Sequence, residues 1–150
     1  MLTWHQGLWE EDAERIFVIA EEVWEDIGLG TLGQIDINVN MFEWLYHNSG
    51  MVVLVGVDER EVIQGYFVGV VEPMIFQQTK THLKQTTAGF TAKHREYLEY
   101  VKMVKEVEKF GTELGVEVIS ISVGSEHASD ILQRRNGYAF NDITLVKEIN

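Results

Sequence analysis

The residues that could carry chemistry in this sequence are histidines and carboxylates, because the chain contains no cysteine and so no disulfide, thiolate metal site or cysteine nucleophile. The histidines are His5, His47, His82, His94 and His127. No two of them have the helical or short-loop spacing of a metal site, so no metal is predicted, and isolated polar histidines are one interpretation. His94 differs from the other four in being a candidate general base, because it stands beside Arg95 at the start of an expected helix.

Glu72 is a second residue with two interpretations. It comes at the end of an expected strand, directly before Pro73, where a carboxylate is a natural strand terminator or a candidate general base. The sequence contains no Gly-x-Ser-x-Gly, no Walker-type loop and no His-Glu-x-x-His. None of the familiar hydrolase, nucleotide-binding or zinc-protease sites is therefore indicated.

The formal net charge is −12, which argues against nucleic acid and anionic membranes as partners. All of it lies in residues 1–75, where fourteen carboxylates face only two cations, Arg15 and Arg60. Residues 76–150 are balanced, with ten charges of each sign. The acidic half is either a solvated face or a docking surface for a cationic partner or substrate.

The elements that must position these residues begin with a helix over residues 10–27. Its apolar stripe has helical spacing: Ala13, Ile16, Phe17, Ala20, Val23, Trp24 and Ile27. A glycine-rich turn over residues 28–33 follows. A second helix is predicted over residues 36–47, capped by Asp36, with Met41, Trp44 and Leu45 on its apolar side. Trp4 and Trp9 either pack inward or anchor a partner protein.

Residues 51–57 form an uninterrupted apolar run, typical of a strand buried on both faces. A polar turn over residues 58–61 and a strand over residues 62–71 complete an antiparallel hairpin, which Pro73 is expected to end. Residues 79–92 are expected to form a loop that enters a third strand near residues 85–92.

A long helix is predicted over residues 95–114, ended by Gly115. Its predicted buried side is Tyr97, Tyr100, Val101, Val104, Val107, Phe110 and Leu114. A strand over 116–123, a short helix over 125–136 capped by Ser125 and closed by Gly137, and an extended segment over 138–149 follow. This order predicts one mixed α/β domain over residues 1–150, in which the long helix is a right-handed crossover between parallel strands.

The order resembles that of the GNAT superfamily of N-acetyltransferases over nearly the whole chain. The stretch Phe90-Thr-Ala-Lys-His-Arg95 runs into the long helix where that family has its bent strand and pyrophosphate loop. The helix that closes with Gly137-Tyr138 looks like the family's last helix, which typically ends in Gly-Phe. The resemblance implies acetyl-CoA as cofactor, with its pyrophosphate bound by backbone N–H groups at the start of the long helix.

The resemblance places Arg95 at the first position of the cofactor loop, with N–H groups near Lys93 and Leu98 as further phosphate ligands. Glu96 stands where the family has a glycine, and Leu98 and Tyr100 stand at later small positions. Glu96 would repel a diphosphate, and the two bulky side chains would crowd it. The resemblance therefore implies a degenerate loop.

In the last helix, the family's asparagine and its general-acid tyrosine fall on Glu126 and Gln133, and an amide has no proton to give at neutral pH. Two hypotheses remain. In one, the chain is an N-acyltransferase for an amine acceptor, with Glu72 or His94 as the base. In the other, it is a catalytically silent protein–protein interaction module, similar to GNAT-like proteins encoded among the virion genes of some tailed phages. A cytoplasmic or virion-associated location is expected.

Overall fold

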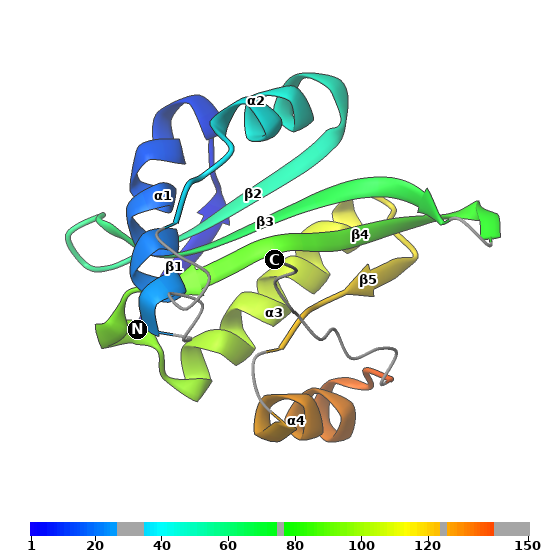
Figure 1. Cartoon of the computed structure of the whole chain (residues 1–150). Coiled ribbons are helices and arrows are strands. Elements are labelled where there is room, and N and C mark those ends of the chain that lie inside the picture. The colour runs from blue at the N-terminus through cyan, green and yellow to red at the C-terminus, as the bar shows by residue number, and fades with distance from the viewer. Residues whose placement is uncertain (27–34, 75–76, 124–125, 140–150) are drawn as a thin grey trace, which may run out of the picture. The chain divides into compact units, whose positions relative to one another are not determined.

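A computed structural model of the chain describes residues 1–26, 35–74, 77–123 and 126–139. The chain divides into two compact units, Met1–Ser120 and Ile121–Asn150. The described residues of the first unit contain the sheet and three α-helices, and those of the second contain α4 (Glu126–Asn136) (Figure 1).

The sheet of the first unit has the strand order β1-β2-β3-β4-β5. Its strands are β1 (Thr3–Gln6), β2 (Gly50–Val57), β3 (Ile63–Met74), β4 (Gln77–Phe90) and β5 (Val118–Ser120). Neighbouring strands are antiparallel except β4 and β5, which are parallel. Helix α3 (Tyr97–Glu113) connects these two. The structure therefore confirms the predicted hairpin-led mixed sheet of an α/β protein.

Helix α1 (Trp9–Asp26) follows the predicted apolar stripe and buries Ile16 and Ile19 against one face of the sheet. Figure 1 shows α1 and α2 (Val39–Asn48) on that face and α3 on the other. Trp9 is fully buried and stacks on Phe42 of α2, with ring centroids 5.2 Å apart. Of the two interpretations of Trp9, the structure thus favours inward packing.

Strand β1 was not expected from the sequence, because four residues are too few for a periodicity argument. It pairs with β2, and Trp4 lies edge-on to Phe90 with ring centroids 5.8 Å apart. A Cβ added to Gly56 would lie 2.8 Å from the Trp4 ring, so this glycine leaves room for the indole. Trp4 therefore packs inward as well.

Two expectations about α2 were wrong. The N-cap is Asn38 rather than Asp36, since the Asn38 side chain accepts a hydrogen bond from the Met41 N–H at 3.0 Å. Met41 and Trp44 are more than half exposed, whereas Phe42 packs against the core. The stacking of Phe42 on Trp9 decides which face of this short helix turns inward.

Pro73 does not end β3, which continues to Met74 with Pro73 opposite Thr81. A register shift follows at Pro73/Met74, and proline is tolerated at such irregular positions because its missing N–H breaks no regular ladder. Strand β4 begins at Gln77, so the loop expected over residues 79–84 was wrong. The β-branched threonines of this stretch suit a strand.

Helix α3 begins at Tyr97, after a 3₁₀ turn over Ala92–His94, and its N-cap is Glu96. Gly115 ends it with φ +73°, and the Val116 N–H donates to the Gly111 carbonyl, as predicted. Leu114 is half exposed, contrary to expectation, because it follows the last helical turn. The buried positions are Glu99, Met103, Val104, Val107 and Gly111.

Strand β5 is three residues long, shorter than the predicted span 116–123. In the second unit, α4 ends at Asn136 and Gly137 adopts φ +73°, which confirms the predicted stop. The turn at residues 28–33, the Ser125 cap and residues 140–149 of the expected last segment lie outside the described residues. In the described part of the chain, no helix is long and apolar enough to cross a membrane.

Candidate functional site

Strand β4 departs from β5 near the middle of its length. The parallel pairing covers only His82–Lys84 opposite Val118–Ser120. On the β3 side, Gly69 pairs with Gln85 and Val68 with Thr87, so Thr86 is an extra residue in a β-bulge. A bulge bends its strand and increases the local twist. The bulge thus lies where β4 leaves its parallel neighbour, four residues before the stretch Phe90–Arg95 in which the resemblance placed the bent strand and loop.

The start of α3 is occupied by carboxylates from the end of α1. The Arg95 guanidinium pairs with Asp26 and, at 3.4 Å, with Glu22 Oε1. The same Glu22 oxygen accepts the Ala92 N–H at 2.6 Å. Arg95 Nε donates to the Phe90 carbonyl at 2.9 Å. Arg95, the cation of the expected phosphate position, therefore already has anionic partners within the protein.

The other loop residues give a diphosphate little support. Lys93 and Glu96 are exposed, and Leu98 is 66% exposed. Tyr100 turns inward, where burial raises the pKa of its phenol. Its hydroxyl is buried and has no hydrogen-bond partner among the described residues. Lys93, Arg95 and Leu98 thus all come from the segment that leads into the first turn of α3.

The two candidate bases are far apart. Glu72 of β3 lies opposite His82, and His94 lies four residues beyond the other end of β4. At about 3.3 Å per residue, His82 and Phe90 alone are separated by roughly 26 Å along the strand. Glu72 and His94 therefore cannot act on one reacting atom. The His94 N–H donates to the Thr91 carbonyl at 2.8 Å within the 3₁₀ turn.

His82 was not singled out from the sequence, yet it lies beside the strand divergence. Its Nε2 is 2.6 Å from Ser120 Oγ of β5, and the pair is partly buried. Because residues 79–84 were expected to form a loop, His82 was not expected to lie on a strand. The alternation of apolar Leu83 with the polar residues His82 and Lys84 is a strand signal in the sequence that could have revealed it.

An apolar pocket of about 200 Å³ lies between α1, the segment before α2, and the sheet. Its described lining is Ile16, Phe17, Ala20, Trp24, Ile35, Ile37, Asn38, Phe42, Tyr66 and Thr87. The Tyr66 hydroxyl and Thr87 Oγ1 are 2.9 Å apart and form a hydrogen bond. Burial raises the pKa of Tyr66, so its hydroxyl stays protonated at neutral pH. The sequence did not reveal this pocket, because its walls come from four separate segments.

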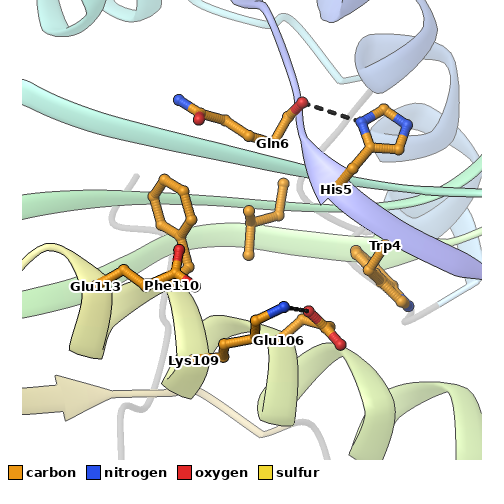
Figure 2. A pocket seen from close by; sticks show the side chains of 8 residues that line it. Trp4, His5, Gln6, Glu106, Lys109, Phe110 and Glu113 are labelled. Carbon is orange, nitrogen blue, oxygen red and sulfur yellow. Dashed lines mark hydrogen bonds and ion pairs between the residues drawn. The ribbon is translucent and has the colours of Figure 1, made fainter.

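A second hollow of about 300 Å³ lies between β1 and α3 (Figure 2). Trp4 and Phe110 line it together with charged side chains of α3. Lys109 and Glu106 form an ion pair across one turn at 4.0 Å. Its charges are largely exposed and of both signs, so it has no feature that selects one ligand. In the described part of the chain, no group of three or more histidine, aspartate or glutamate side chains could hold a metal ion.

Comparison with known proteins supports the fold of this chain but says nothing about its site residues. No family model matches the sequence, and no curated protein is significantly similar to it. Among solved structures, a putative acetyl transferase from Pyrococcus furiosus has a TM-score of 0.73 and 15% identity, over 99% of this chain and all of the other. A GNAT family acetyltransferase from Staphylococcus aureus has a TM-score of 0.67 and 13% identity, over 99% and 98%.

A third similar structure is an aminoglycoside acetyltransferase from an uncultured soil metagenomic sample, in complex with sisomicin. Its TM-score is 0.70 at 14% identity, over 99% of this chain and 97% of the other. At such low identity the likeness shows the fold alone. This chain therefore has the GNAT fold, the architecture of these acetyltransferases.

Proposed function

We propose that this chain is a GNAT-fold protein in which the acetyl-CoA site is degenerate and acetyl transfer is weak or absent. The observation that supports the proposal is the contact of Glu22 and Asp26 with Arg95 and the Ala92 N–H. In this proposal the cation expected to bind the pyrophosphate, Arg95, is instead paired with the protein's own carboxylates.

Repulsion between these carboxylates and the phosphates of acetyl-CoA would weaken binding more than the loss of the Arg95 ion pairs would. Partly exposed ion pairs are worth only about 0–1 kcal/mol each, so a ligand could displace them at small cost. The displaced carboxylates would remain close to the phosphates, however. Two like charges about 4 Å apart repel by roughly 4 kcal/mol at the effective dielectric constant of a protein surface. Glu96 adds a third carboxylate at the same helix start.

Calorimetric titration with acetyl-CoA tests this proposal. Wild-type protein is expected to give no saturable heat at millimolar ligand. The double variant Glu22→Gln/Asp26→Asn keeps the side-chain sizes but removes both charges, and it is expected to bind measurably. Arg95→Ala added to that variant should abolish the binding again. Micromolar binding by the wild type that disappears in Arg95→Ala would overturn the proposal and favour an active N-acyltransferase.

A second candidate function is the protein–protein interaction module. It is favoured by the exposed apolar side chains of α2, since Val39, Met41 and Trp44 are 44%, 53% and 58% exposed. Exposed tryptophan is a frequent anchor of protein interfaces. A role in virion assembly is one form of this candidate. Cross-linking in the producing cells or particles tests it: cross-links from α2 that are lost in Trp44→Ser support the module, and their persistence argues against it.

A further inference from the structure

The apolar pocket between α1 and the sheet has the composition of a ligand site. Apolar and aromatic walls with a few convergent polar groups are typical of small-molecule pockets. Here the walls come from α1, α2 and the segment before α2, and the polar groups are the Tyr66 and Thr87 hydroxyls. Tyr66 is 1% exposed, so its hydroxyl is held in a fixed position.

The lining predicts the charge of a ligand. None of the described residues that line the pocket is charged. Burying an ammonium or carboxylate group without a counter-charge costs several kcal/mol. A ligand of this pocket is therefore uncharged, even though the acidic half of the chain would attract cations to the surface around it.

The hydroxyls of Tyr66 and Thr87 predict one hydrogen bond to a ligand. Each hydroxyl carries one hydrogen, and the bond between Tyr66 and Thr87 uses only one of the two. The other O–H can donate to an oxygen of a ligand. The volume of about 200 Å³ suits a single ring, since an apolar cavity of about 150 Å³ is large enough to bind benzene.

We propose that this pocket binds a small, uncharged, single-ring molecule that carries one hydroxyl or carbonyl oxygen, with the ring against Phe17 and Phe42 and the oxygen at Tyr66 and Thr87. The inference does not depend on acetyl transfer, because the pocket residues are distinct from those at the start of α3. An active or inactive acetyl-CoA site leaves it unchanged.

Titration with phenol, followed by the amide NMR shifts of Ile37 and Thr87, tests the proposal. Phenol is expected to give saturable shifts, toluene weaker binding, and benzylamine and benzoate none. Ala20→Leu should fill the pocket and abolish the shifts. The matched control is Val18→Leu on the exposed face of the same helix, where the side chain is 51% exposed and does not line the pocket. This control should leave phenol binding unchanged.

Thr87→Val provides an independent test if Ala20→Leu does not fold. Valine has nearly the shape of threonine but lacks the hydroxyl, so phenol affinity should fall by roughly threefold to tenfold, the worth of one hydrogen bond. Toluene affinity should not fall. The proposal is wrong if phenol gives no saturable shifts, if benzylamine binds equally well, or if neither Ala20→Leu nor Thr87→Val weakens phenol binding.

Discussion

A buried carboxylate on α3 holds the first strand in place. Glu99 is 6% exposed, and its two oxygens accept the Leu2 N–H at 3.0 and 3.2 Å. Lys102 reaches the Leu2 carbonyl at 3.5 Å. Hydrogen bonds to a carboxylate offset the cost of burying its charge. Glu99 therefore ties β1 to α3 across ninety-seven positions of the sequence.

Removal of this carboxylate should destabilise the protein. Glu99→Ala leaves the buried Leu2 N–H without an acceptor, which costs about 1–3 kcal/mol. Urea unfolding measures the effect, with Glu113→Ala at an exposed position of the same helix as control. Equal stability of the two variants would contradict the structural role of Glu99.

Asp58 organises the turn between β2 and β3. Its side chain accepts the N–H groups of Arg60 at 2.9 Å and Val62 at 3.1 Å, and the Gln64 amide at 2.8 Å. These hydrogen bonds, first that from Val62, hold the pKa of Asp58 below its ordinary value of 3.8. A lowered pKa in the folded state adds stability above the unfolded pKa, and that contribution is lost as the pH falls through the folded pKa.

Asp58→Asn should therefore be less stable than wild type at about pH 7, and the difference should shrink at about pH 3, because Asp58 with its ordinary pKa of 3.8 in the unfolded chain then takes up a proton more readily than in the folded protein. Urea midpoints of both proteins at the two pH values provide the measurement. A difference of the same size at both pH values would show that the ionised carboxylate contributes nothing.

At the scale of elements, α2 turns only part of its apolar surface inward. Phe42 lies in the core cluster with Trp9, whereas Trp44 is exposed. The matched variants Phe42→Ala and Trp44→Ala each remove one aromatic ring from the same helix. Phe42→Ala is expected to cost about 2–3 kcal/mol, and Trp44→Ala less than about 0.5 kcal/mol. Thermal or urea unfolding checks both, and a larger loss from Trp44→Ala would mean that the helix presents the opposite face.

At the scale of the whole molecule, the concentration of negative charge in residues 1–75 is the dominant electrostatic feature. The exposed carboxylates of α1 include Glu10, Glu11, Glu14, Glu21 and Glu25. Arg15 is the one cation of this helix and is outnumbered by these carboxylates; its Nε donates to the Ile63 carbonyl at 3.0 Å. We propose that a protein partner docks on this half, in which case salt would weaken the encounter.

The same charges should make the folded protein sensitive to ionic strength. Added sodium chloride, up to about 0.3 M, screens repulsion among like charges, so the unfolding temperature should rise. In the variant Glu21→Lys/Glu25→Lys, which replaces two exposed carboxylates, the rise should be smaller. An unfolding temperature that falls with salt would show that attractive pairs outweigh the repulsion.

The order of the main helices and strands followed from the sequence because it depends on local patterns. The apolar stripe of α1, the uninterrupted run of β2 and the glycines at 115 and 137 each act within a few neighbouring residues. The likeness to the GNAT fold followed from that order. Strand β1, with four residues, lay below what periodicity resolves, whereas the strand expected over residues 116–123 is present as the shorter β5.

Contacts between distant segments were decided only by the tertiary structure. Arg95 pairs with carboxylates 69 and 73 positions earlier, and no local pattern shows which helix end meets which loop. The face of α2 depends on where Trp9 lies, and the apolar pocket exists only once α1 is packed on β3 and β4. Sequence thus determined which elements form, whereas packing decided which side chains meet, because hydrophobic attraction is non-directional and shape selects the partners.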